Sequence, residues 1–196
     1  MRCESEMAFF FYFAGAFFLI SRQIISAMDE FNCGLMPVCG ENPKILILGS
    51  FPSLKSLEKN EYYGNPKNHF WKIMEAVFGT DTSLSYDKRI ESLKNAGIAL
   101  WDAASECRRE KSSDATLKDV KPNDIARILI KNKPVRVIAL NGKTGAEKYF
   151  KKFHPDFSKK FPDVKVITLP SSSPANARQS LDDKIKEWSA LKEYIL

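Results

Sequence analysis

Two amide side chains and two tyrosines lie close together in the segment Tyr62–Trp71 (YYGNPKNHFW), just before an apolar helical pattern. The amides of Asn65 and Asn68 can each donate and accept hydrogen bonds, so either could hold a water molecule or a polar ligand. An aromatic ring with a free face beside them would be a stacking platform for a nucleobase. Two plainer interpretations stay open, in which Asn68 is only the N-cap of the helix and the aromatic residues only fill the core.

Three other segments carry small or polar residues that could bind a ligand: Gly49–Ser53 (GSFPS), Asn141–Lys143 (NGK) and Pro170–Arg178 (PSSSPANAR). The hydroxyls and backbone amides of the third segment could clamp a phosphate, and the small apolar tip formed by Pro174 and Ala175 could wedge into a duplex. The plainer interpretation of this segment is a strand-to-helix turn in which serine supplies the cap.

Several classes of site are disfavoured by what the sequence lacks. It contains neither GxxxxGK[ST] nor GxGxxG, the glycine-rich signatures of nucleotide-phosphate loops. The four cysteines are irregularly spaced without a CxxC pair, and there are only two histidines. We therefore expect no metal site, no disulfide framework and no cofactor.

The elements that must position these residues can be predicted from apolar patterning. Short apolar runs bounded by Gly or Pro are typical of buried strands, and apolar residues at helical spacing lie between them. The predicted strands are Lys44–Leu48, Gly97–Trp101, Val135–Leu140 and Val164–Leu169, and the predicted helices are Asn68–Phe78, Asp87–Asn95, Pro122–Lys131, Gly142–Lys152 and Leu181–Tyr194. Alternation of strands and helices predicts an α/β fold: a three-layer sandwich with a four-stranded, mainly parallel sheet.

In such a sheet the ligand site lies outside the carboxyl ends of the strands. The first, third and fourth predicted strands lead directly into the three polar segments, and the second ends at Trp101-Asp102. We therefore expect these loops, distant along the chain, to converge on one site.

The charge of the 196-residue chain is uneven. Residues 1–103 carry 10 basic and 12 acidic side chains, a net charge of −2, whereas residues 104–196 carry 20 and 12, a net charge of +8. A polyanionic partner for the second half is consistent with this asymmetry, as is a lysine-rich solvated surface.

The first 27 residues differ from the rest. Met7–Ile20 contains no charge and six phenylalanines, but it is shorter than the roughly 20 apolar residues of a membrane span. We interpret residues 1–27 as a dispensable extension or a start-site artefact, with an anchor or a helix packed on the domain as alternatives. Residues 28–196 are expected to form one domain, in a cytoplasmic protein without stable membrane association.

The motifs GSFPS, YYGNPKNHFW and LPSSSPANA, each placed at a strand end, resemble the hypoxanthine-DNA glycosylase branch of the uracil-DNA glycosylase superfamily. The resemblance runs from about Lys44 to the C-terminus. It implies that the protein binds DNA and excises a flipped, deaminated base as a monofunctional enzyme without a metal. We also expect the protein to be a monomer. Relatives position the attacking water with Asn or Asp in the first motif, where this sequence has Phe51.

The resemblance further implies roles for individual residues. An Asn of the GNPKN segment would position the water, Asn65 as first choice and Asn68 as second. Expected base-contacting residues are Phe51, Tyr63, Asp102 and Ser171. Expected DNA-contacting residues are Ser53, Lys143, Ser173, Pro174, Ala175 and Arg178.

The sequence thus predicts a monofunctional glycosylase for hypoxanthine in DNA. Three alternatives remain: a uracil-type DNA glycosylase, a non-catalytic nucleic-acid-binding module that has lost its water-positioning group, and a small-molecule α/β hydrolase or nucleotide-binding protein. The last two differ in DNA affinity, since only the binding module would bind DNA in a salt-sensitive way.

Overall fold

The computed structural model describes residues 32–108, 117–132 and 134–195. The chain divides into two units, residues 1–31 and Asn32–Leu196, and the second unit contains the helices and strands of the described residues. The expectation for residues 1–27 falls outside the described residues.

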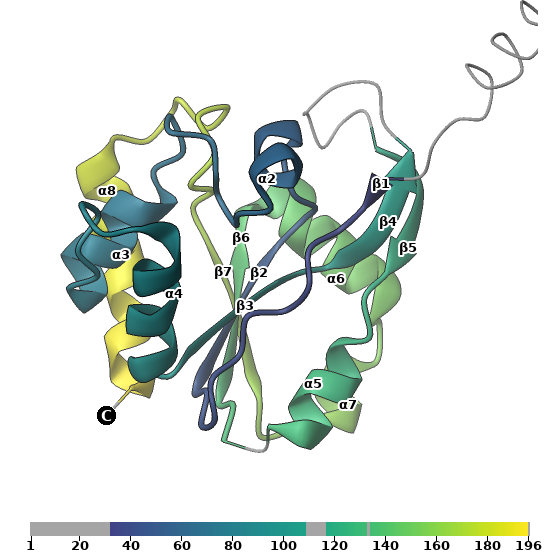
Figure 1. The fold of residues 1–196 in the computed structure, drawn as a ribbon. Helices are drawn as coiled ribbons and strands as arrows, with labels where there is room; N and C mark the ends of the chain where they lie inside the picture. Colours follow the sequence, from purple (N-terminus) through teal and green to yellow (C-terminus); the bar gives the residue numbers. More distant parts are fainter. Residues whose placement is uncertain (1–31, 109–116, 133, 196) are drawn as a thin grey trace, which may run out of the picture. The chain divides into compact units, whose positions relative to one another are not determined.

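The predicted four-stranded sheet is present, and all its strands are parallel (Figure 1). Its strands are β2 (Ile45–Gly49), β3 (Ile98–Asp102), β6 (Val137–Asn141) and β7 (Lys165–Leu169), in the order β3-β2-β6-β7. Every residue of β2 is buried because helices cover both faces of the sheet, which explains why its sequence is an unbroken apolar run. The predicted α/β class and strand positions are confirmed.

Alternate residues of the strands feed two cores, one on each face of the sheet. Ile45 and Ile47 belong to the core beneath one helical layer, and Leu46 and Leu48 to the core beneath the other. The first layer contains α3 (Phe70–Phe78), α4 (Tyr86–Asn95), α8 (Leu181–Trp188) and the 3₁₀ helix η3 (Ser189–Tyr194). The second contains α5 (Ile125–Lys131), the π-helix η2 (Gly142–Glu147), α6 (Lys148–Phe153) and α7 (Phe157–Lys160).

A second sheet was not predicted. It is antiparallel, has the order β1-β4-β5, and consists of β1 (Asn32–Cys33), β4 (Ala104–Arg108) and β5 (Lys118–Pro122). The sequence of β5, KDVKP, is polar and mostly exposed, so it lacks the apolar pattern on which strand prediction depends. The six-residue helix α2 (Leu54–Lys59) was missed as well, because it is too short to show a helical period.

The direction of chain connection reverses between the neighbouring strands β2 and β6. The chain leaves β2 through α3 and α4 to reach β3 on one side, and leaves β6 through η2 and α6 to reach β7 on the other. Parallel sheets bind ligands in the crevice above such a reversal. The two strand ends at this point are Gly49 and Asn141.

Candidate functional site

One pocket lies at the carboxyl edge of the parallel sheet and has a volume of about 1230 Å³. All four strand-end loops contribute to its wall, as the sequence predicted. The expected site residues that line it are Phe51, Ser53, Tyr63, Asn68, Asp102, Lys143, Ser171, Ser173, Ala175 and Arg178. Asn65 and Pro174 are absent from this lining.

The two candidate amides are placed differently. Asn68 lines the pocket, and its Oδ1 accepts a hydrogen bond of 2.9 Å from the backbone N–H of Phe70. Asn65 Oδ1 accepts instead from the backbone N–H of Lys67 at 3.0 Å, in an exposed turn. The geometry therefore favours Asn68 over Asn65 as the amide that meets a ligand. The same hydrogen bond gives a partner to the backbone N–H of Phe70, the first residue of α3, although His69 is the N-cap residue.

Tyr63 is held in the pocket wall by contacts on both its ring and its hydroxyl. The ring stacks on Phe70, with 3.7 Å between ring centroids and 14° between planes. The hydroxyl accepts a hydrogen bond of 3.1 Å from Asn141 Nδ2. Burial, and next the nearby Asp102 carboxyl, raise the pKa of Tyr63 well above its usual value, so the phenol stays protonated at neutral pH. Phe70 covers one ring face, so a base could stack only on the opposite one.

Asn141 was predicted only as part of a polar strand-end segment and was given no role of its own, yet it joins three parts of the pocket. Besides its bond to Tyr63, its Nδ2 donates to Ser172 Oγ at 2.8 Å, and its Oδ1 accepts from the backbone N–H of Ser172 at 2.8 Å. Ser172 is fully buried. The only sequence signal for Asn141 was its place as the polar residue that ends a buried strand.

Asp102 ends β3 and is 4% exposed. It lies so close to Gly49 that a Cβ added at Gly49 would overlap its Oδ1, which explains the glycine at the end of β2. Phe51 follows in the same loop; it lines the pocket and also packs against Ala104 and Cys107. Three aromatic residues, Phe51, Tyr62 and Tyr63, thus contribute to a wall that otherwise contains many polar groups.

The loop from Pro170 to Arg178 is stiffened by its own hydrogen bonds. Ser171 Oγ accepts from the backbone N–H of Ser173 at 3.2 Å, and Ser173 Oγ accepts from that of Ala175 at 3.3 Å. Pro174, Ala175 and Arg178 remain exposed. The arrangement presents a small apolar tip on a rigid base.

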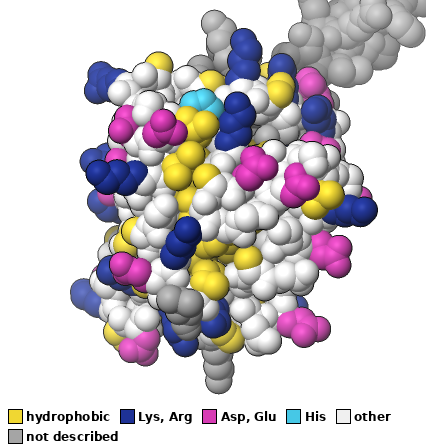
Figure 2. All heavy atoms as spheres, turned by 90° about the vertical axis from the view of Figure 1, so that its left-hand side faces the viewer, with side chains coloured by type: hydrophobic (Ala, Val, Ile, Leu, Met, Phe, Trp, Pro, Cys, Tyr) yellow, Lys and Arg dark blue, Asp and Glu magenta, His cyan; other side chains and the backbone are white. Residues whose placement is uncertain are grey.

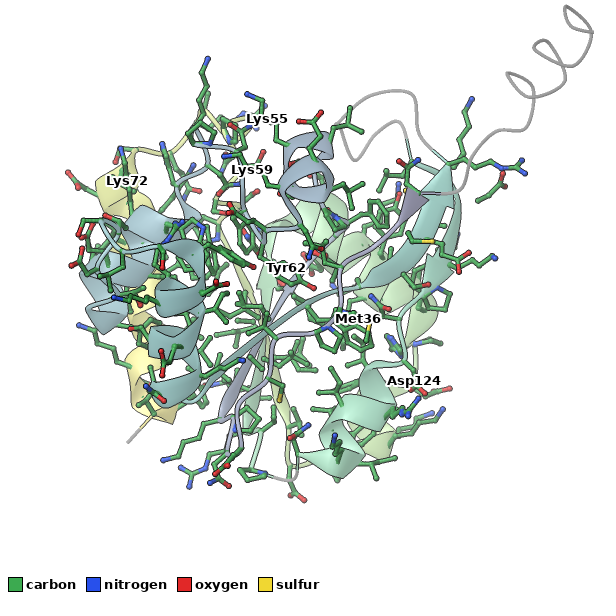
Figure 3. The ribbon with its side chains drawn as sticks, in the orientation of Figure 1. Met36, Lys55, Lys59, Tyr62, Lys72 and Asp124 are labelled. Carbon is green, nitrogen blue, oxygen red and sulfur yellow. The ribbon has the colours of Figure 1, made fainter. Side chains whose placement is uncertain are left out.

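Exposed basic side chains outnumber exposed acidic ones in the pocket lining, where Glu187 is the exposed acidic residue. Lys143, Lys148 and Arg178 line it directly. Lys55 and Lys59 of α2 and Lys72 of α3 lie along the same edge of the molecule, whereas Asp124 lies far from it (Figure 3). Ser53, the N-cap of α2, lines the pocket and accepts a hydrogen bond from the backbone N–H of Ser56. A polyanion could therefore lie across the pocket mouth with its charge compensated.

The described residues contain neither a cluster of metal-binding side chains nor a helix that could span a membrane. They contain no group of three or more His, Cys, Asp or Glu side chains placed to hold a metal ion. Among the same residues, no helix is long and apolar enough to cross a membrane.

Comparison with known proteins identifies the family to which this architecture belongs. The family model of the uracil DNA glycosylase superfamily matches residues 36–193, and the chain belongs to that superfamily. Among its relatives is a protein of Methanosarcina acetivorans named hypoxanthine DNA glycosylase, which is 36% identical over 159 residues, covering 81% of this chain and 96% of the relative. A protein of Methanosarcina barkeri with the same name is 34% identical over 157 residues, covering 80% and 94%.

A solved structure supports the fold assignment. The solution NMR structure of a Methanosarcina acetivorans protein, described as a candidate uracil DNA glycosylase, matches with a TM-score of 0.71 and 33% identity, covering 85% of this chain and 99% of that one. The expected superfamily and its fold are confirmed.

Proposed function

We propose that this protein is a monofunctional DNA glycosylase that hydrolyses the N-glycosidic bond of hypoxanthine in DNA. The observation that carries this proposal is the pocket at the β2–β6 reversal, lined by the motifs of a superfamily whose similar members bear the name hypoxanthine DNA glycosylase. The basic edge around the pocket fits a DNA substrate. We also propose that the protein acts as a monomer, and we assign it to the cytoplasm, where it would meet DNA.

The reaction begins when the damaged nucleotide leaves the helix and enters the pocket. This step costs a few kcal/mol and costs least for a mispaired base. The exposed tip formed by Pro174 and Ala175 would fill the space in the duplex, while Lys143, Arg178 and the serines Ser53 and Ser173 bind neighbouring phosphates.

Inside the pocket the base would lie between Phe51 and the ring face of Tyr63 that Phe70 does not cover. Asp102 and Ser171 offer polar atoms to its edges. Hydrogen bonds to O6 or N7 make hypoxanthine a better leaving group, because negative charge develops on the purine as the bond breaks. The sugar becomes oxocarbenium-like, and the nearby DNA phosphates stabilise its positive charge.

Asn68 would hold the attacking water. Its Oδ1 is fixed by the bond from Phe70 N–H and retains a second lone pair that can accept a hydrogen bond from the water. That contact points a lone pair of the water at the anomeric carbon. An amide is a poor base, so its contribution is mainly proximity and orientation. This assignment explains how the pocket can work with Phe51 in place of the usual Asn or Asp.

The test is a single-turnover assay on duplex oligonucleotides that contain deoxyinosine or deoxyuridine, followed by alkali to cleave abasic sites. We expect release of hypoxanthine, and strand cleavage only after alkali. Asn68→Ala should slow release by about 100-fold, the effect of losing one well-placed group at the reacting centre. Asn65→Ala is the matched control and should retain the wild-type rate within a factor of about 3.

Three outcomes would contradict parts of the proposal. Faster release from deoxyuridine than from deoxyinosine would indicate a uracil-type enzyme. Salt-sensitive DNA binding without release of either base would indicate a binding module. A larger loss in Asn65→Ala than in Asn68→Ala would reassign the water-positioning residue.

A further inference from the structure

Lys184 is a buried cation that the proposed reaction does not use. It lies on α8 with 0% of its surface exposed, and among the described residues Asp102 is the only other buried charged side chain. Removing an ammonium group from water is costly, and an apolar side chain of similar volume often fills such a position with equal or greater stability. The presence of lysine here therefore calls for a reason other than packing.

The two partners of Lys184 belong to two different loops of the active site. Its Nζ donates to the backbone carbonyl of Asn176 at 3.0 Å and lies 3.5 Å from Nδ1 of His69. Asn176 lies in the loop that carries the apolar tip, and His69 directly follows Asn68. The amine thus contacts both the DNA-facing loop and the segment that carries the water-positioning amide.

These two loops are also bonded to each other. The backbone N–H of His69 donates to the carbonyl of Ser172 at 3.0 Å. Within the 170–178 loop, Asn176 Nδ2 donates to the carbonyl of Ser171 at 3.2 Å. Trp188, one turn further along α8, donates from Nε1 to the carbonyl of Pro170 at 2.9 Å. Figure 2 views the side on which α3 and α8 lie, with a histidine at its upper end next to basic side chains.

The contact with Lys184 favours one tautomer of His69. A lysine ammonium only donates hydrogen bonds, so in this 3.5 Å contact Nδ1 accepts and the ring proton lies on Nε2. Burial, then the neighbouring Lys184 and Lys72, lower the pKa of His69, which keeps the ring neutral at neutral pH. Burial also lowers the pKa of Lys184.

We propose that Lys184 is a positioning residue that holds the Asn68 segment and the 170–178 loop in a fixed position relative to each other. Insertion of the loop tip into DNA and orientation of water at Asn68 would then occur in the same arrangement of the protein. This inference rests on the proposed function and deepens it, since it names a residue that acts on the reaction through His69 and Asn176.

The central experiment compares Lys184→Met with Lys186→Met, a change at an exposed lysine of the same helix. Methionine approximates the shape of lysine without the charge, so the melting temperature of Lys184→Met should equal or exceed that of the wild type. Hypoxanthine release at saturating enzyme should nevertheless fall at least 10-fold, while the Kd for the DNA rises less than 3-fold. Lys186→Met should change neither. A wild-type release rate in folded Lys184→Met would overturn the proposal.

A second variant covers the case in which Lys184→Met does not fold. His69→Ala removes the acceptor from a partly exposed position and should leave the protein folded. It should reduce the release rate in the same direction, again with a smaller effect on Kd. An unchanged release rate in this variant would equally overturn the proposal.

A readout independent of catalysis separates this inference from the proposed function. Long-range ¹H–¹⁵N spectra of protein labelled in its histidines should show His69 as the Nε2–H tautomer in the wild type and in Lys186→Met, and as a tautomer mixture in Lys184→Met. If the wild type releases no base, the proposed function fails while this test still applies. A His69 that carries its proton on Nδ1 in the wild type would show that Lys184 does not donate to it.

Discussion

Replacing Asn141 with alanine would remove the side chain that joins β6, the Tyr63 segment and the triple-serine loop. Three hydrogen bonds of 2.8–3.1 Å would be lost. Each contributes about 1 kcal/mol net, and a buried donor left without a partner costs about 1–3 kcal/mol. The N–H of Ser172 is such a donor, because that residue is fully buried. We therefore expect a loss of about 3 kcal/mol, a large share of a typical domain stability of about 5–15 kcal/mol.

Urea unfolding of Asn141→Ala measures this loss, with Asn132→Ala as the matched control. Asn132 makes one side-chain hydrogen bond, from Nδ2 to the carbonyl of Ile128 at 2.9 Å, and its loss should cost about 1 kcal/mol. Base release by folded Asn141→Ala should also slow, since Tyr63 and Ser172 lose their shared anchor. Equal stability losses in the two variants would refute the view that Asn141 holds the pocket together.

Three further predictions concern backbone, charge and pH. Gly142→Ala places a Cβ 2.7 Å from Ser171 Cβ at a φ of 102°. Its free energy of unfolding, measured by urea denaturation, should fall by about 2 kcal/mol or more. The free energy of unfolding should fall less in the control Gly79→Ala, whose added Cβ meets nothing within 4 Å. Lys143→Ala should weaken DNA binding and lower the slope of log Kd against log salt by about 1, measured by anisotropy; an unchanged slope would remove Lys143 from the phosphate contacts. The folded-state pKa of His69 lies below 6.5, so the folded state binds fewer protons and stability should fall as pH drops below about 6.5. His69→Gln should lose less stability than the wild type between pH 7.5 and 5.5, and equal losses would contradict this.

The parallel sheet could be predicted because its strands are buried on both faces. A strand such as β2 must be apolar at every position, so its sequence identifies it without knowledge of its neighbours. The convergence of the loops followed from the same information, because parallel strands bring their carboxyl ends to one edge. The antiparallel sheet gave no such signal, since β5 is a mostly exposed polar strand held by pairing with β4.

The choice between Asn65 and Asn68 could not be made from the sequence. Both amides precede α3, and both use Oδ1 to accept from a backbone N–H two residues later. Local sequence preferences therefore do not distinguish Asn65 from Asn68. Only the path of the chain between Gly64 and Phe70 decides which of the two lines the pocket, and that path depends on the bond from His69 N–H to Ser172, far along the chain.

The backbone conformation of Tyr63 could not be predicted from the sequence either, and the reason is energetic. Its φ of 56° is in the left-handed region, which costs a non-glycine residue about 1–2 kcal/mol. Two contacts offset this cost: the ring stacks on Phe70, and the hydroxyl accepts a hydrogen bond from Asn141, 78 residues away in the sequence. Strain of this kind persists only where surrounding contacts determine the conformation, and it concentrates at functional sites. Because the compensating contacts come from another strand end, no local pattern could predict that a tyrosine would adopt this backbone conformation. The pocket wall is therefore a property of the assembled loops, and perturbing Asn141 should change Tyr63 even though their segments share no sequence signal.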